Sequence, residues 1–371
     1  MIKQDGKTVT NIANSLIKDG LLIAGGYSSF TGGRRREILI MNPDYGYIIG
    51  IHLDINFLIG IVTNFQSKVL LRERIPISPS ETKANLVSKI RKTVDFLIKK
   101  ANIPPKKLLG VGFVASGFYD QAEGKWLVSV NNLHWKDVPI VSMLSQQVDC
   151  PIRLEDCSRA LGLGEKWFGI AKQEENFICL DIGAGIGCAI VQNGRLYKGA
   201  FNFAGEIGHT IVVPEGDLCS CGNKGCLETV ASGWALAKRA RSRLSKGEKS
   251  LLRELCHDDV AALDADMIFR AAHNGDKMAM DLLESASKYL GIAIANLVNL
   301  LNPELIILSG HFSSIEDFSL LSLIDKVRRY AMPESFNRVK IVTSPLGDDA
   351  AALGATTLIL DSIFHIESIS V

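Results

Sequence analysis

Four potential metal ligands, one imidazole and three thiols, lie within eighteen residues and constrain the fold of this chain more than any other feature. They are His209, Cys219, Cys221 and Cys226, in the sequence GHTIVVPEGDLCSCGNKGC. Tetrahedral zinc takes four such ligands, and Gly222 and Gly225 would let the short loop fold back so that three sulfurs converge. A closed Cys3His set leaves no open coordination position, so we predict a structural zinc ion. The alternatives are a disulfide cluster or three unrelated core cysteines.

Length and composition indicate a soluble globular protein. The 371 residues are enough for two or three domains, and 47% apolar with 22% charged residues is ordinary for that class. No apolar run approaches the ~20 residues of a membrane span, and the polar N-terminus does not resemble a secretory signal. We therefore expect a cytoplasmic protein, without membrane contact, whose other cysteines are reduced and buried.

The net charge of +1 is unevenly distributed. Residues 1–41 contain six lysines and arginines against three acidic residues, which leaves +3 there and −2 on the rest of the chain. A near-neutral total argues against a general nucleic-acid coat. A small basic head on a neutral body is instead typical of an attached nucleic-acid-binding module.

The head has the pattern of a recognition helix followed by a winged hairpin. Residues 8–22 predict an amphipathic helix with its stop at Lys18-Asp19-Gly20, and residues 21–42 predict two apolar strands around a Gly/Ser-rich loop. The helix carries short polar groups suited to bases and phosphates, and the loop ends in arginines that would hold phosphates or enter the minor groove. These candidate DNA contacts are Thr8, Thr10, Asn11, Asn14, Ser15, Arg34, Arg35 and Arg36. The head is expected to be incomplete, because only seven residues precede Thr8; the alternative is a solvated helix and hairpin packed on the body.

The body reads as a duplicated α/β unit with a cleft between two lobes. Three consecutive strands from Tyr45 precede alternating helices and strands, and a second copy of this order begins near residue 176. We place a partial winged-helix DNA-binding region at 1–44, a first lobe at 45–150 and a second lobe with the zinc loop at 151–371.

Two positions carry candidate phosphoryl-transfer chemistry. Gly183, Gly185 and Gly187 follow a predicted strand, where backbone amides can approach an anion; the alternative is a tight hairpin turn. Asp156 follows the strand PIRLE and opens a helix. It would either cap that helix or act as the general base that takes a proton from a sugar hydroxyl.

Other polar residues are candidate ligand contacts. Asn132, in a pair of amides before LHW, would either contact sugar hydroxyls or form a turn. Glu206 and Glu228 flank the zinc loop, which could present them to a ligand. Asp348 and Asp349 precede an alanine-rich helix, and we expect them to cap it.

Together these motifs resemble the ROK family (repressor, open reading frame, kinase), and within it the xylose-repressor-like transcriptional regulators. The resemblance extends from Thr8 to Phe364 and is carried by GAFNFAGEIGHT, CSCGNKGCLE, NLHWKDVPI, LGIAIANLVNLLNPELIILSG and LGDDAAALGA. It implies an actin-like ATPase fold of two ribonuclease-H-like lobes with a sugar site between them. By motif position that site would use Asn132, Glu155, Asp156, Glu206, His209 and Glu228.

Departures from the kinase pattern separate the possible functions. Where family kinases resemble DxGGTK, this chain reads Asp54-Ile55-Asn56-Phe57-Leu58-Ile59, so both glycines and the threonine are replaced. The second phosphate loop has Ala184 where threonine is usual, and the sugar-site AsnAsp pair has become Glu155-Asp156. A backbone cradle for phosphates should not survive these changes, and we expect no ATP cofactor.

We favour a sugar-responsive repressor that binds operator DNA as a homodimer through the head and a small sugar through the body. A second hypothesis is an ATP-dependent sugar kinase with Asp156 as its catalytic base. A third is a sugar-binding regulator that does not touch DNA.

Overall fold

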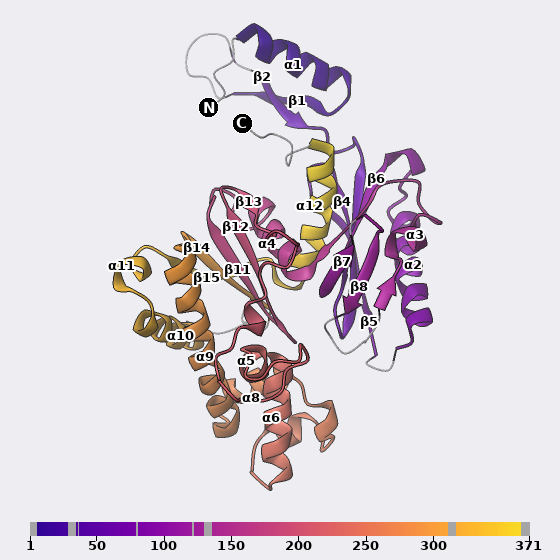
Figure 1. Ribbon diagram of the computed structural model, residues 1–371. Helices are drawn as coiled ribbons and strands as arrows, with labels where there is room; N and C mark the ends of the chain where they lie inside the picture. The colour runs from indigo at the N-terminus through magenta and orange to yellow at the C-terminus, as the bar shows by residue number, and fades with distance from the viewer. Residues whose placement is uncertain are drawn as a thin grey trace.

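The computed structural model describes residues 6–28, 35, 37–78, 81–120, 122–129, 136–310 and 317–364. Within these ranges the chain forms a small head above two lobes that stand side by side (Figure 1). None of the helices in the described ranges has the length and apolar character needed to cross a membrane.

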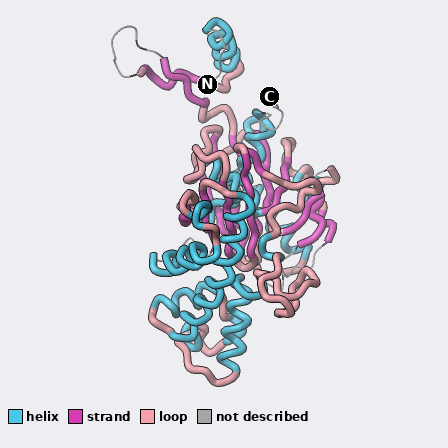
Figure 2. The backbone as a smooth tube through the Cα atoms, turned by 60° about the vertical axis from the view of Figure 1, so that its left-hand side comes forward, coloured by secondary structure: helices cyan, strands magenta, loops and turns pink. Residues whose placement is uncertain are grey.

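The head consists of one helix and one hairpin that project together from the end of the body (Figure 2). Helix α1 is Gly6–Lys18, and strands β1 (Leu22–Tyr27) and β2 (Glu37–Met41) pair antiparallel. The helix ends at Lys18, at the predicted Lys18-Asp19-Gly20 stop, where Gly20 adopts a left-handed conformation with φ +77.

Each lobe is built on a five-stranded sheet, and the two sheets have the same topology. The first has the order β10-β6-β3-β4-β5 and the second the order β13-β12-β11-β14-β15. In each, the central strand (β3 or β11) pairs antiparallel with the strand that follows it (β4 or β12) and parallel with the fourth strand of the repeat (β6 or β14). This repetition confirms the predicted duplication and the actin-like ATPase fold.

The strands have the following bounds. The first sheet contains β3 (Tyr47–Leu53), β4 (Phe57–Asn64), β5 (Val69–Pro76), β6 (Leu108–Ala115) and β10 (Ile152–Asp156). Because β10 pairs with β6, the first lobe extends beyond the expected boundary at residue 150, to Asp156. The second contains β11 (Phe177–Ile182), β12 (Ile186–Gln192), β13 (Arg195–Leu196), β14 (Leu305–Gly310) and β15 (Lys340–Thr343). A small sheet of β7 (Gly117–Asp120), β8 (Lys125–Ser129) and β9 (Lys136–Val138), which the sequence did not predict, packs on the first lobe.

Helices cover both sheets. On the first lobe α2 (Lys83–Lys100) and α3 (Ile140–Leu144) bury apolar side chains against one face of the sheet. The helical part of the second lobe comprises α5 (Glu228–Ala231), α6 (Gly233–Ser245), α7 (Leu252–Leu255), α8 (Ala265–His273), α9 (Lys277–Leu301), α10 (Asp317–Tyr330) and α11 (Pro333–Phe336). Short 3-10 turns are η1 (Pro105–Lys107), η2 (Ile207–His209), η3 (Val260–Ala262) and η5 (Gly347–Asp349).

Two helices, α4 (Cys157–Trp167) and α12 (Ala350–Phe364), cross between the lobes. Their backbones approach so closely that a Cβ on Gly354 would lie 1.7 Å from the carbonyl oxygen of Ala160. A Cβ on Gly112 of the first sheet would lie 1.9 Å from the carbonyl oxygen of Ala355. Only glycine is compatible with these distances, so small residues allow α12, from the predicted second lobe, to pack on the first sheet as well.

The far end of α12 reaches the head. Ile359 and Leu360 are fully buried, and Leu21 and Met41 at the base of the hairpin pack against the same cluster. Helix α12 therefore extends from the region between the lobes to the root of the head (Figure 1).

The close crossing of α4 and α12 predicts that the stability of the protein depends strongly on the size of the side chain at position 354. We expect Gly354→Ala to destabilise the protein by about 1–3 kcal/mol, because the methyl group must displace the backbone of α4. Ser362→Ala, on the same helix outside the crossing, is the control and should change stability little. Urea unfolding measures both, and equal stability of the two variants would contradict the close packing.

Candidate functional site

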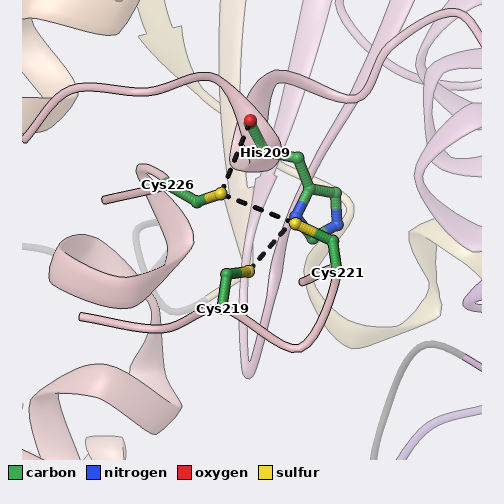
Figure 3. Close-up of side chains that lie close together, drawn as sticks. All are labelled: His209, Cys219, Cys221 and Cys226. Carbon is green, nitrogen blue, oxygen red and sulfur yellow. Dashed lines mark hydrogen bonds between the residues drawn. The ribbon is translucent and has the colours of Figure 1, made fainter. Parts of the chain in front are cut away.

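The four predicted metal ligands converge in the structure (Figure 3). Their three sulfurs and one imidazole nitrogen all lie within 4.8 Å of one another. Nδ1 of His209 is 3.5 Å from Sγ of Cys219, and Sγ of Cys221 is 3.6 Å from Sγ of Cys226. All eight cysteines are free thiols, so the four donors form a closed Cys3His set, which fits the ligand chemistry of tetrahedral zinc.

Glycines shape the loop that carries the sulfurs, as predicted. Gly222 and Gly225 have φ values of +92 and +74, in the left-handed region. A Cβ on Gly225 would lie 1.7 Å from the carbonyl oxygen of Val213, so this position cannot carry a side chain without moving the loop. The amide of Cys219 closes the turn by donating to the carbonyl of Asn223 at 2.8 Å.

His209 connects the metal cluster to a group of carboxylates. While Nδ1 faces the sulfurs, Nε2 lies 3.8 Å from Oε2 of Glu206. Glu228, at the start of α5, accepts a hydrogen bond from the amide of Ile186 at 2.9 Å. One nitrogen of the imidazole thus lies beside the sulfurs, and the other lies on the side of Glu206.

Asp156 caps α4 and lies in the same polar region. Its Oδ1 accepts from the amides of Ser158 (2.9 Å) and Arg159 (3.2 Å), and its Oδ2 is 3.4 Å from the amide of Gly117. Burial raises the pKa of Asp156, and Arg159 partly opposes that shift. Burial and then the charge of Asp156 raise the pKa of Glu206. The structure therefore brings Asp156, Glu206 and His209 into one electrostatically coupled site.

The other two predicted sugar contacts are Asn132 and Glu155. Asn132 lies outside the described residues. Glu155 is only 3% exposed, and its carboxylate is surrounded by protein donors: Nε of Arg159 at 3.4 Å and Nζ of Lys198 at 3.0 Å. Sequence reasoning missed both cations. No local pattern connects Lys198 to Glu155, whereas Arg159 lies four residues after Glu155, a spacing that could have indicated the pair.

The first phosphate loop is filled by side chains. Phe57 stands beneath the guanidinium of Arg74, whose carbon is 4.1 Å from the ring centroid, and the ring of His52 meets Phe57 edge-on. Arg74 pairs with Asp348, and Nε of Arg72 is 2.6 Å from Oδ1 of Asp349. The two aspartates expected to cap α12 thus join the first sheet to the segment that enters α12.

A cleft of about 1810 Å³ lies beside this filled loop. It is lined among others by Asp54, Asn56, Asp181, Gly183 and Asp348. The cleft is the place where the resemblance puts a nucleotide, but an amide and an aromatic side chain, Asn56 and Phe57, occupy the positions where the kinase pattern has glycines.

The second predicted phosphate loop forms the hairpin turn between β11 and β12. The amide of Gly183 donates to the carbonyl of Gly185 at 3.0 Å. A Cβ on Gly187 would lie 2.0 Å from Oγ of Ser158, so this glycine allows β12 to pack on α4. Close packing thus accounts for Gly187, and the cofactor role of Gly183, Gly185 and Gly187 stays a prediction.

The candidate DNA contacts of α1 are all exposed. They are Thr8, Thr10, Asn11, Asn14 and Ser15, and Arg35 of the loop is exposed as well. Arg34 and Arg36 lie outside the described residues. Val9 and Ile12 on the apolar side of α1 are also 52% and 49% exposed, so the head, unlike the lobes, buries little apolar surface of its own.

Comparison with known proteins identifies the class. Residues 48–362 match the model of the ROK family, and the chain belongs to that family. The chain is 34% identical over 357 residues to the xylose repressor of Caldicellulosiruptor bescii, which covers 96% of this chain and 88% of the relative.

Two solved structures are similar over most of their length. One is a ROK family transcriptional regulator described as a homolog of the Escherichia coli MLC protein (TM-score 0.79, 25% identity, 96% of this chain and 89% of that chain). The other is a ROK family glucokinase from Streptomyces griseus in complex with glucose and AMPPNP (TM-score 0.74, 28% identity, 84% of this chain and 99% of that chain). The regulator covers 96% of this chain and the glucokinase covers 84%. The difference, 12% of the 371 residues, is about the length of the head.

Two substitutions distinguish the helix-capping role of Asp156 from the effect of its charge. Asp156→Asn keeps an oxygen acceptor for the amides of Ser158 and Arg159, whereas Asp156→Ala does not, so we expect the alanine variant to be less stable by about 1 kcal/mol. Because burial raises the pKa of Asp156, its charged form is destabilising, and this cost disappears as the pH falls through the folded-state pKa. Wild type should therefore gain stability relative to Asp156→Asn on acidification. Urea unfolding at neutral and acidic pH measures both effects; equal stability of the two variants would contradict the capping role.

Proposed function

We propose that this chain is a sugar-responsive, DNA-binding transcriptional repressor of carbohydrate metabolism whose kinase-like body no longer transfers phosphate from ATP. The observation that carries the proposal is an ordered polar site at Asp156, Glu206 and His209 beside a first phosphate loop filled by Phe57 and Arg74. The chain keeps the groups that would bind a sugar and fills the place that would bind phosphates.

The sugar would bind between the lobes, at the carboxylates and the imidazole. Carboxylate oxygens accept from sugar hydroxyls, and Nε2 of His209 faces the same region as Glu206. A site that satisfies several hydroxyls discriminates strongly against analogues that lack one. Asn132 and Glu228 complete the proposed contacts, and the similarity to a xylose repressor makes xylose the first ligand to test.

The cysteines and His209 would bind a structural zinc ion. Bound zinc would hold the loop between Glu206 and Glu228, and it would fix the tautomer and orientation of His209 through Nδ1. The ion would therefore serve ligand binding by ordering the loop rather than by contacting the sugar.

The head would bind operator DNA. The polar side chains of α1 would contact bases or phosphates, and Arg34, Arg35 and Arg36 would contact the backbone or minor groove. Two heads on a palindromic operator imply a homodimer. Sugar binding would reach the head through α12, which begins at the filled loop and ends against Leu21 and Met41.

A metal measurement tests the zinc proposal. We expect about one zinc ion per chain by elemental analysis, and we expect Cys226→Ser to lose it and to weaken sugar binding about tenfold or more. Cys150→Ser, which changes a cysteine outside the cluster, is the matched control and should keep the metal. Wild-type protein that is folded and binds no zinc would contradict the proposal.

Binding experiments test the regulator itself. We expect calorimetry with a panel of pentoses, hexoses and N-acetyl sugars to find one ligand, and that ligand should change affinity for a palindromic duplex recovered by in vitro selection. Asn11→Ala with Asn14→Ala should weaken DNA binding, with about 1–3 kcal/mol lost for each base contact removed, and should leave sugar affinity unchanged. Folded, zinc-loaded protein that binds none of these sugars would contradict the sensor role.

A sugar kinase is the second candidate, and one observation favours it. Asp156 stands where a base would, and its Oδ2 keeps only a long contact with the amide of Gly117. ATP-dependent sugar phosphorylation that Asp156→Asn abolishes would establish the kinase and overturn the loss of phosphotransfer.

A further inference from the structure

The loop of residues 197–206 connects β13 to η2 and ends at Glu206. It is compact, because the amide of Ala204 donates to the carbonyl of Lys198 at 3.1 Å. Gly199, Asn202 and Gly205 have φ values of +71, +62 and +99. A Cβ on Gly205 would lie 2.1 Å from the carbonyl oxygen of Cys188, so the end of the loop is held against β12 immediately before Glu206.

An ion pair fastens the other end of this loop to the end of β10. Nζ of Lys198 is 3.0 Å from Oε2 of Glu155, and the Glu155 side chain is only 4% exposed. The other oxygen, Oε1, accepts from the amide of Asp156 at 3.0 Å and lies 3.4 Å from Nε of Arg159. Both oxygens of Glu155 therefore face protein donors, which leaves the carboxylate little capacity to accept from a ligand.

An aromatic contact joins the same loop to the first lobe. The rings of Phe203 and Phe118 meet edge to face, with centroids 4.8 Å apart. Phe118 lies in β7, next to Gly117, whose amide faces Oδ2 of Asp156. Both attachments of the loop thus end on the first lobe, at residues that lie close to Asp156.

The charge of Glu155 explains why a lysine is needed. A buried carboxylate is strongly unfavourable unless cations or hydrogen-bond donors compensate it. An amide, as in the kinase pattern, would carry no charge to attract Lys198. The Lys198 side chain is 34% exposed, so its ammonium keeps part of its hydration and pairing costs it little.

We propose that Lys198 is a positioning residue: its ion pair with Glu155 fastens the 197–206 loop to the first lobe and places Glu206 opposite Asp156. Glu155 then acts on the ligand through Lys198 and the loop, not by contact. This inference rests on the proposed sugar site and assigns a role to the carboxylate that distinguishes this chain from the kinase pattern.

The experiment compares Lys198→Met, Lys198→Arg, Glu155→Gln and the double variant Glu155→Gln with Lys198→Met. Lys326→Met is the matched control, because it removes another partly buried lysine–glutamate pair, with Glu284 at 2.8 Å, between α10 and α9. Hydrogen exchange of the backbone amides of residues 199–206 is measured without ligand. Calorimetry then measures the affinity for the sugar that wild type binds.

We expect Lys198→Met and Glu155→Gln each to speed exchange in the loop and to weaken sugar binding by about tenfold. The double variant should be no worse than either single variant, since both remove the same pair. Lys198→Arg should restore most of both properties, and Lys326→Met should leave both at wild-type values.

Loop exchange in ligand-free Lys198→Met that equals wild type would overturn the inference, as would a wild-type sugar affinity in that variant. A fall in thermal stability without faster loop exchange would indicate a merely structural pair and would also overturn it. Wild type that binds no sugar would defeat the proposed function, and the ligand-free exchange would still decide separately whether the pair fastens the loop.

Discussion

The structure depends on the close crossing of α4 and α12. These helices contact each other over glycine and alanine backbones, and Gly354 leaves no room for even a methyl group. Helix α4 packs on the second sheet and α12 on the first, and the two helices are closely packed against each other. A change in the angle between the lobes must therefore move α12. Because α12 ends in the apolar cluster at the root of the head, the crossing also sets where the head stands.

The polar site is built around the same helices. Asp156 is the N-cap of α4, so the residue that caps the helix also belongs to the polar site with Glu206 and His209. Glu206 comes from the opposite lobe. Burial raises the pKa of both carboxyls; Glu155 adds to the shift of Asp156, which Arg159 opposes, and Asp156 adds to the shift of Glu206. Such a site is unfavourable when empty, and a polyol that donates hydrogen bonds to both carboxylates would relieve that cost.

At the first predicted phosphate loop, side chains stand where the kinase pattern has glycines. The replacement of glycines by Asn56 and Phe57 is visible in the sequence, but the sequence does not show what fills the space. The structure shows that Arg74 covers Phe57 and pairs with Asp348, at the entrance to α12. Where the kinase pattern has a phosphate loop, Phe57, Arg74 and Asp348 thus connect the first sheet to the start of α12, the helix that reaches the head.

The amino-acid sequence alone was enough to predict the features that repeat along the chain or that follow from local spacing. Ligand spacing identified the Cys3His set, the repeated strand order predicted the duplicated α/β body, and residue order placed Asp156 at the start of a helix. It missed the small sheet β7-β8-β9, and it treated Glu155 as a ligand contact without finding Lys198 and Arg159. The pair of Glu155 with Lys198 and the crossing of α4 and α12 are visible only in the folded protein, because each joins residues distant in the chain and depends on how the lobes pack. The pair with Arg159 has a local i,i+4 spacing that the sequence does contain. No local pattern encodes that packing, whereas capping, turns and metal-ligand loops depend on neighbours within a few residues.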